Sequence, residues 1–220
     1  MAFLKMSYRD ISKIRVCKVL EDNYNTILKD YQNFKFDIDL DNVNSDSNWK
    51  LWKSVHEASL AMAKTRDDNI DWENVSFEPY KKSHSWYGLI VNHLSVWEGA
   101  LIATKAKFDL SPSSELEPTP ICERFFNNTL NILKDYPEIT SIMIAKFPAG
   151  KELPIHRGYK EILRIHLGLI VPDGDIGFCV NGEKTKWENG KCLAFNDFFE
   201  HSAWNHTNED RINLIVDVKR

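Results

Sequence analysis

The sequence has no long apolar run, no basic block and no secretory leader, and each absence excludes a class of protein. No apolar run approaches the roughly 20 residues of a membrane-spanning helix, and residues 1–15 carry charge early, unlike a signal peptide. The 220 residues include 28 Lys and Arg against 32 Asp and Glu, a net charge of −4, with no basic stripe for nucleic acid. We therefore expect a cytoplasmic protein with no membrane span and no nucleic-acid partner.

Cysteines are few and are not spaced for metal binding or dithiol chemistry. No two of them form a C-x-x-C pair, which argues against a zinc knuckle or a thioredoxin-like motif. Without a secretory context we expect four reduced and mostly buried thiols: Cys17, Cys122, Cys179 and Cys192. The chain length fits one domain, and nothing in the sequence indicates an oligomeric state.

The first 140 residues show mainly helical periodicity. Apolar residues at helical spacing predict a helix over about 11–31, although residues 14–20 also fit an extended segment. Further helices are predicted over 49–64 and within 118–136, where Pro120 lies near the first turn. Alternation predicts a half-buried strand over 34–40, and residues 86–91 also have the composition of a strand.

From residue 141 onward, short β-type runs alternate with turn residues. Asn-Gly, the strongest short hairpin signal, occurs at 181–182 and again at 189–190. Strands at this spacing predict an all-β sandwich or barrel that follows a helical layer. The predicted strands are 142–147, 163–171, 176–180, 184–187, 192–195, 202–205 and 212–218.

Two histidines in this β-rich segment have the spacing of metal ligands. His156 and His201 are 45 positions apart, and both border predicted strands. An Fe(II) oxygenase needs a few ligands on rigid strands and open positions for its co-substrate and O2. Gly158 stands two positions after His156, where such sites usually have a carboxylate, and it offers no side-chain ligand.

Two arginines and a third histidine provide candidates for an anion site. Arg164 and His166 are two residues apart, so they project from the same face of one strand. Arg211 begins the last predicted strand. A planar guanidinium binds a carboxylate through two charge-assisted hydrogen bonds. Together these residues predict a pocket for a metal and an anion.

These motifs, in this order and spacing, resemble the aspartyl/asparaginyl β-hydroxylases, which are Fe(II)- and 2-oxoglutarate-dependent oxygenases. The ten-residue step from His201 to Arg211 matches the family's spacing, and the likeness extends over residues 86–217. The matching pieces are His-Arg-Gly at 156–158, LRIHLGLIVP at 163–172, WENG at 187–190, FNDFFEH at 195–201, Trp-Asn at 204–205, and Arg211 with the strand at 214–218.

The resemblance implies a fold and a set of roles. The fold would be a double-stranded β-helix, the jelly-roll or cupin-like fold, mainly β with N-terminal helices. The whole chain, 1–220, would be one oxygenase domain, with a helical N-terminal layer over 1–80 and the β-helix over 86–218. His156 and His201 would bind Fe(II), with water in place of the carboxylate ligand. The co-substrate 2-oxoglutarate would be held by Arg164, His166 and Arg211.

The resemblance also assigns the catalytic acid and the reaction. Asp197 would orient iron-bound water, although Asn196-Asp197 is also typical of a turn. The reaction would consume O2 and 2-oxoglutarate, release succinate and CO2, and hydroxylate an unactivated C–H bond.

The resemblance names no substrate for this chain. Ile162 replaces an arginine that helps animal members bind an acidic substrate, the interval from His156 to Arg164 is one residue shorter than theirs, and no co-substrate serine is evident in 142–147. We therefore expect a small amino acid or amino-acid-derived substrate. The alternatives are an aspartyl or asparaginyl side chain in a peptide or protein, a lipid acyl chain, halogenation instead of hydroxylation, or a non-catalytic cupin-like binding module.

The remaining histidines and the aromatic residues have plainer interpretations. A lone histidine is more often structural or exposed than a ligand, and we assign that place to His56, His84, His93 and His206. The tryptophans, with Phe195 and Phe198, are interpreted as core residues rather than cofactor contacts.

Overall fold

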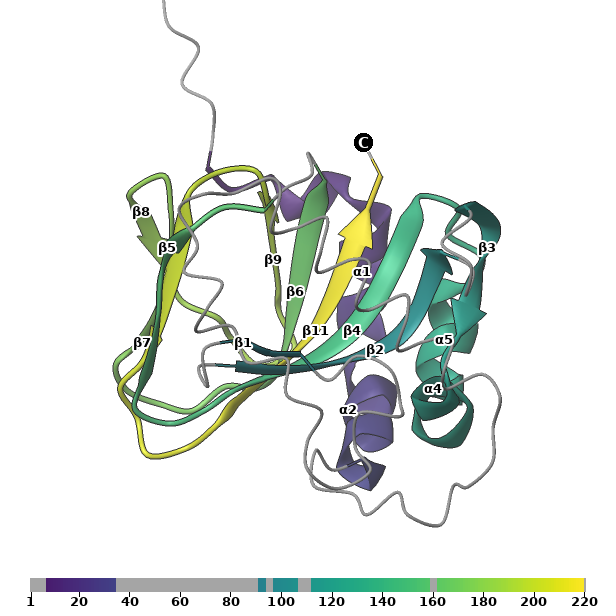
Figure 1. Cartoon of the computed structure of the whole chain (residues 1–220), viewed down its shortest axis with the longest axis horizontal. Helices are drawn as coiled ribbons and strands as arrows, with labels where there is room; N and C mark the ends of the chain where they lie inside the picture. The colour runs from purple at the N-terminus through teal and green to yellow at the C-terminus, as the bar shows by residue number, and fades with distance from the viewer. Residues whose placement is uncertain (1–6, 35–90, 94–96, 107–111, 159–161, 220) are drawn as a thin grey trace, which may run out of the picture.

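Two antiparallel sheets pack against each other, and helices cover the outer face of the larger sheet (Figure 1). The computed structural model describes residues 7–34, 91–93, 97–106, 112–158 and 162–219. The larger sheet has seven strands in the order β1-β2-β4-β11-β6-β9, with β3 paired to β2, and the smaller has four in the order β5-β10-β7-β8. This is the expected double-stranded β-helix with N-terminal helices.

The strands of the larger sheet are β1 (Val91–His93), β2 (Trp97–Ala106), β3 (Pro112–Pro118), β4 (Ile139–Phe147), β6 (Leu163–Ile170), β9 (Cys192–Asn196) and β11 (Arg211–Val218). Those of the smaller sheet are β5 (Lys151–His156), β7 (Ile176–Val180), β8 (Glu183–Thr185) and β10 (His201–Asn205). The helices are the 3-10 turn η1 (Ile11–Lys13), α1 (Arg15–Asp22), α2 (Tyr24–Asn33), α4 (Pro120–Phe125) and α5 (Asn127–Leu133).

Strict alternation along the central strands separates two apolar cores. On β11, the side chains of Ile212, Leu214 and Val216 join the core beneath the helices. The residues between them point the other way, between the two sheets, because successive strand residues face opposite sides. The second core lies there and is mainly aromatic, with Phe147, Phe178, Trp187 and Phe195 as its largest members. Polar residues on this inner face are therefore placed inside the β-helix.

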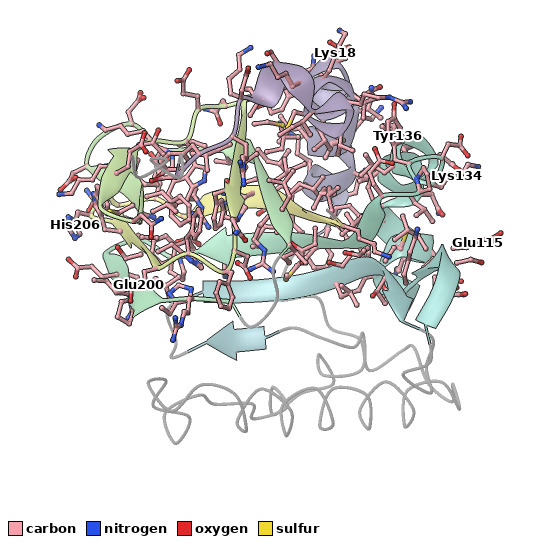
Figure 2. The ribbon with its side chains drawn as sticks, turned by 90° about the horizontal axis from the view of Figure 1, so that it is seen from above. Lys18, Glu115, Lys134, Tyr136, Glu200 and His206 are labelled. Carbon is pink, nitrogen blue, oxygen red and sulfur yellow. The ribbon has the colours of Figure 1, made fainter. Side chains whose placement is uncertain are left out.

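The helical layer is fixed to the larger sheet by apolar packing and to itself by one buried carboxylate. Val16 and Leu20 of α1, four residues apart, lie on one helix face and are buried, so residues 15–20 are helical rather than extended. Asp30 of α2 accepts hydrogen bonds from the backbone N–H and hydroxyl of Thr129, both at 2.8 Å. Because the first amides of α5 lack partners within that helix, Asp30 acts as its cap from a neighbouring helix. Figure 2 shows Lys18 of α1 and His206 beyond β10 on opposite sides of the molecule.

The strands predicted from residue 141 onward are all present, with ends that differ by up to three residues. The Asn181-Gly182 hairpin is confirmed: both residues have positive φ, 49° and 82°, and they join the paired strands β7 and β8. The prediction of a second hairpin, at Asn189-Gly190, is wrong. Asn189 instead exchanges hydrogen bonds with the backbone of Val171 (2.8 and 3.2 Å), and the chain crosses there from one sheet to the other.

The elements that precede β6 are less well anticipated. The helix predicted within 118–136 is two helices that meet at Phe126, and β2, β3 and β5 were not predicted. The strand at 34–40, the helix at 49–64 and most of the strand at 86–91 lie outside the described residues. That residues 1–80 form one helical layer stays a prediction. All four cysteines are free thiols, three of them buried.

Candidate metal and anion site

A cavity opens between the two sheets on the inner face of β4, β6 and β11. Both iron-ligand candidates and the three co-substrate candidates lie in its wall. The lining residues are Met143, Ala145, Phe147, Leu153, His156, Arg164, His166, Phe178, Trp187, Phe195, His201, Ala203, Arg211 and Ile215. The inward side of the alternation thus collects most of the residues that the sequence pointed to.

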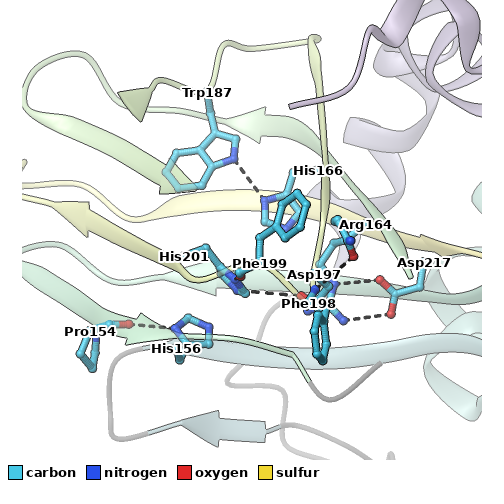
Figure 3. Close-up of polar contacts among 11 residues, drawn as sticks. Pro154, His156, Arg164, His166, Trp187, Asp197, Phe198, Phe199, His201 and Asp217 are labelled. Atoms are coloured by element: carbon cyan, nitrogen blue, oxygen red, sulfur yellow. Dashed lines mark hydrogen bonds and ion pairs between the residues drawn. The ribbon is translucent and has the colours of Figure 1, made fainter. Parts of the chain in front are cut away.

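The two candidate metal ligands face each other across neighbouring strands. His156 ends β5 and His201 begins β10, and the two are register partners in that antiparallel pair. Their ring centroids are 4.1 Å apart. The Nδ1 of His156 lies 2.8 Å from the carbonyl oxygen of Pro154, and that of His201 lies 2.7 Å from the carbonyl of Phe199 (Figure 3). A carbonyl only accepts, so each Nδ1 carries the proton and each Nε2 keeps the lone pair that binds a metal.

Both rings are held in the neutral form. Burial, with a smaller contribution from the charge of His201, lowers the pKa of His156 to about 4. Burial likewise lowers the pKa of His201 to about 4. Neutral imidazole is the form that binds metal, so the pair is ready for a cation at neutral pH. Among the described residues, no three His, Cys, Asp or Glu side chains are grouped as a metal site; the protein supplies two imidazoles here.

Three charged side chains, Asp217, Arg164 and Asp197, are joined by hydrogen bonds beside the histidine pair (Figure 3). Arg164 of β6 donates from Nε and one terminal nitrogen to the two oxygens of Asp217, at 2.8 and 3.0 Å. Its other terminal nitrogen donates to Asp197 at 2.6 Å. Asp217 also accepts from the hydroxyl of Ser141 at 3.0 Å. Such a bidentate pair fixes a guanidinium in orientation as well as in charge.

Asp197 is brought to the histidines by these hydrogen bonds. Its Oδ1 is 3.8 Å from Nε2 of His201, and its side chain is 4% exposed. Burial raises the pKa of Asp197, while the neighbouring Arg164 guanidinium acts in the opposite direction. The carboxylate therefore lies within reach of a ligand held by the two imidazoles.

Gly158 has a steric reason to be glycine. Its backbone N–H donates to the carbonyl of Asp197 at 2.8 Å. A Cβ at position 158 would lie only 1.7 Å from Oδ2 of Asp197, and 2.5 Å from its Cγ. The Asp197 carboxylate thus occupies the space that a side chain at 158 would fill.

Arg211 is the second arginine of the cavity; it is buried, and its surroundings are aromatic. Its guanidinium carbon lies 4.1 Å from the ring centroid of Trp187 and 5.1 Å from that of Phe147. Within the described part of the chain it makes no ion pair, and its Nε is buried without a hydrogen-bond partner. Burial lowers the pKa of Arg211 to about 9, so the group stays charged at neutral pH. A buried charge in this state calls for an anionic guest.

His166 offers a second unmet donor in the same wall. It is 7% exposed, and its Nδ1 is 3.2 Å from the indole nitrogen of Trp187. Its Nε2 is buried and has no partner among the described residues. Burial, with the charge of Arg211 next in importance, lowers the pKa of His166 well below its usual range.

The sequence model described as aspartyl/asparaginyl beta-hydroxylase matches residues 21–220, which include all of these site residues. The chain belongs to this family. A curated relative, the ornithine lipid ester-linked acyl 2-hydroxylase of Rhizobium tropici, is 44% identical over 93 residues, which are 41% of this chain and 33% of that protein. The aspartyl/asparaginyl beta-hydroxylase of Homo sapiens is 38% identical over 97 residues, 41% of this chain and 13% of that protein.

The chain thus spans a third or less of the length of these two curated relatives. Among solved structures, a 2OG-Fe(II) oxygenase family oxidoreductase from Burkholderia pseudomallei aligns with a TM-score of 0.41 and 11% identity, covering 56% of this chain and 67% of that one. No helix in the described ranges is both long enough and apolar enough to cross a membrane.

The aspartyl/asparaginyl β-hydroxylase motifs converge on one place in this fold. Arg164 and His166 share a strand face and line the cavity, as alternation predicts. Arg164, however, donates three hydrogen bonds to Asp197 and Asp217, so its contact with a co-substrate stays a prediction. The three remaining members of the set, His156, His201 and Arg211, lie in the same wall.

Sequence reasoning missed Asp217 and underrated Trp187. Asp217 is an acidic residue in the buried strand β11, on the same alternation as Arg211, and that pattern could have indicated an inward charge. Trp187 was interpreted as core only. Of the histidines predicted to be structural or exposed, His206 is on the surface between Asp175 and Glu152, and His93 lies in β1. His56 and His84 are outside the described residues.

Proposed function

We propose that this protein is an Fe(II)- and 2-oxoglutarate-dependent dioxygenase that hydroxylates an unactivated C–H bond of an amino-acid-derived substrate, with succinate and CO2 as co-products. The observation that carries the proposal is Arg211. It is a buried cation without a carboxylate partner in the described chain, and it faces the same cavity as two neutral imidazoles. Two imidazoles that can bind a metal and a guanidinium without a counter-charge line one cavity. This arrangement suits a dianion that binds beside a metal.

The charges of the cavity support the same pairing of guests. Arg164 with Asp197 and Asp217 sums to −1, and Arg211 contributes +1, so these four side chains sum to zero while the histidines are neutral. A divalent cation adds +2 and 2-oxoglutarate adds −2. Both guests together leave the sum at zero, whereas either alone leaves a buried excess of two charges, which is costly in a low-dielectric site.

Each residue then has a definite task. The Nε2 atoms of His156 and His201 would hold Fe(II), which when bound supplies the activation of O2 for the oxidation of 2-oxoglutarate and substrate. Arg211 would bind the far carboxylate of 2-oxoglutarate, and His166 would donate a hydrogen bond to the co-substrate. Arg164 would orient Asp197, and Asp197 would accept a hydrogen bond from water in the third protein-ligand position.

An exposed aromatic side chain beside Asp197 favours an apolar part in the substrate. Phe198 follows Asp197 in the chain and is 46% exposed (Figure 3). The guanidinium of Arg157 lies 5.8 Å from the Phe198 ring. Exposed large apolar side chains beside a cation suit a molecule with an acyl chain and an anionic group. A lipid acyl chain is therefore the second candidate substrate, in keeping with the 44% identical relative that acts on an ornithine lipid.

Hydroxylation is favoured over halogenation by the position of Asp197. A halide beside Gly158 would lie next to the carboxylate that fills that space, and two anions in a buried site repel each other. A cupin-like module that holds only a structural metal would not need an unpaired guanidinium in the same cavity.

The test is a panel assay with purified protein, Fe(II), 2-oxoglutarate and O2, followed by mass spectrometry of substrate and succinate. The panel contains free amino acids, an Asp- and Asn-containing peptide, and an acylated ornithine in detergent. We expect one class to gain one oxygen atom with equimolar succinate, without dependence on chloride. Absence of succinate with every class, in protein that binds iron, would favour the binding module, and a chlorinated product would favour the halogenase.

A further inference from the structure

Trp187 touches both candidate anion donors of the cavity, His166 and Arg211, and we call these three residues the anion end. It follows β8, is 3% exposed, and lies on the inner side of the β-helix. Its indole nitrogen is 3.2 Å from Nδ1 of His166, and its ring lies 4.1 Å from the Arg211 guanidinium. No other described side chain has both of these contacts.

The indole N–H decides which nitrogen of His166 carries the proton. An indole nitrogen donates and cannot accept, so a proton on Nδ1 of His166 would face the indole proton directly. The proton must therefore be on Nε2, since the ring is neutral. Nε2 is the buried atom without a partner, so it is a donor available to an oxygen in the cavity. A carboxylate oxygen fits it, because such an oxygen only accepts.

Asn213 completes the environment of the indole. With its amide nitrogen donating to the carbonyl of Ile212 at 3.1 Å, its amide oxygen lies 3.1 Å from the indole nitrogen of Trp187. The N–H is then shared between Nδ1 of His166 and this oxygen. Asn213 is fully buried, so the indole is held in the orientation that points its N–H toward His166.

The face of the same indole supports Arg211. A guanidinium over a tryptophan face is attracted by the ring quadrupole, and the attraction is stronger away from water. Phe147 adds a second ring at 5.1 Å. Neither ring accepts a conventional hydrogen bond from the guanidinium, and its buried Nε has no hydrogen-bond partner among the described residues. The cation is thus held in place before any anion arrives.

We propose that Trp187 is a positioning residue for the carboxylate of the co-substrate: its N–H sets the tautomer of His166 and its ring holds Arg211, so both donors are preset. The identity of that carboxylate as 2-oxoglutarate rests on the function proposed above. Presetting removes the cost of reorienting two buried groups on binding.

The experiment compares Trp187→Phe with Trp204→Phe. Trp204 also donates its indole N–H, to Asp175 at 2.8 Å, but it lies outside the cavity wall. The first readout is the 15N chemical shifts of the His166 ring in protein without ligands, which report the tautomer. The second is anaerobic titration of 2-oxoglutarate into Mn(II)-loaded protein, with Mn(II) affinity measured beforehand.

We expect wild type and Trp204→Phe to have His166 protonated on Nε2 and to bind 2-oxoglutarate equally. Trp187→Phe should show a mixture of tautomers and bind 2-oxoglutarate about tenfold more weakly, the loss of one buried hydrogen bond, with Mn(II) affinity unchanged. Unchanged 2-oxoglutarate affinity in Trp187→Phe would overturn the inference. So would a wild-type His166 protonated on Nδ1, a result that needs no variant to fold. Failure of wild type to bind 2-oxoglutarate would instead count against the proposed function, and the tautomer would still decide the role of Trp187.

Discussion

Arg164 and Arg211 line one cavity from opposite ends of β11, and their surroundings differ in kind. Arg164 lies opposite Asp217, near the end of β11, and its guanidinium is bound to two carboxylates. Arg211 begins the strand and has two aromatic rings around it, with no carboxylate partner among the described residues. In the metal end, His156 and His201 with Arg164, Asp197 and Asp217, every charged side chain thus has an oppositely charged partner within the protein. The anion end, Arg211 with His166 and Trp187, is not.

The difference separates what the fold supplies from what a ligand must supply. A carboxylate–guanidinium chain needs no guest to be stable, so it can hold Asp197 in place permanently. A buried cation without a counter-charge lowers stability, and it persists where binding an anion is the purpose. Substitutions at the metal end and at the anion end should therefore have different effects on metal binding, co-substrate binding and stability.

The largest effect is expected from removing one imidazole of the metal end. His156→Ala and His201→Ala each leave one protein ligand, so metal affinity should fall more than about a hundredfold, beyond the 10–100-fold typical of outer-shell changes. Succinate formation should be lost with it. Isothermal titration with Mn(II) measures the first, and His206→Ala is the control, since that histidine is on the surface. Near-normal metal binding by either variant would remove it from the ligand set.

Removing the cation of the anion end should act on the co-substrate and spare the metal. Losing a desolvated charge partner costs roughly 3–5 kcal/mol, so Arg211→Ala should weaken 2-oxoglutarate binding by a factor of hundreds or more. Arg211→Lys should recover part of it, because a point charge does not reproduce the guanidinium fork. Anaerobic titration of 2-oxoglutarate against metal-loaded protein measures this. An unaltered affinity would leave the co-substrate assignment to Arg164 and His166.

A methyl group at position 158 should disturb the metal end without touching a ligand. In Gly158→Ala the new Cβ would overlap the Asp197 carboxylate, which must then move from the histidines. We expect metal affinity to fall about 10–100-fold, as for other outer-shell changes, and turnover to fall with it. Gly158→Asp should do at least as much. Gly182→Ala is the control for a general loss of stability, because it strains a positive-φ turn without approaching Asp197, and its metal affinity should stay unchanged. Wild-type metal affinity in Gly158→Ala would show that Asp197 does not need this space.

The two histidines of the metal end should make the folded protein less stable in acid. The pKa values of His156 and His201 are about 4 in the folded protein, and about 6.5 in an unfolded chain. Between these values the unfolded chain binds more protons, so the free energy of unfolding should fall as pH drops from 6.5 toward 4 and be level above 6.5 on their account. The raised pKa of Asp197 acts in the opposite sense. Urea unfolding of wild type and His201→Phe at pH 7 and pH 5 isolates the histidine: the variant should lose less stability, and equal losses would contradict the shift.

Much of the larger architecture could be predicted from local pattern. The Asn181-Gly182 turn and the strict alternation around Arg164 and His166 are short-range signals, and both appear in the structure as expected. The helix break at Phe126 and the role of Asn189 depend on partners far along the chain, Asp30 and Val171. Periodicity carries no information about such partners.

The candidate site residues could be named from motifs, and the contacts between them could not. His156 and His201 could be paired because each borders a strand, yet only the register of β5 and β10 places their rings together. Asp217 lies 53 residues from Arg164, and Trp187 lies 24 from Arg211, so neither pairing is visible without the fold. Gly158 was interpreted as a missing ligand, and the structure adds that it makes room for Asp197.

The unfolding free energies of Arg164→Met and Arg211→Met, measured in urea without metal or co-substrate, test the difference between the two ends most directly. Arg164→Met strands two buried carboxylates and should lose roughly 3–5 kcal/mol, as when one partner of a buried ion pair is removed. Arg211→Met replaces an unpaired buried cation with an apolar chain and should match wild type or exceed it. Added Mn(II) and 2-oxoglutarate should stabilise wild type more than Arg211→Met, because the variant lacks the cation that binds the co-substrate. A loss in Arg211→Met as large as that in Arg164→Met would mean that Arg211 already has its counter-charge within the protein, and would contradict the account.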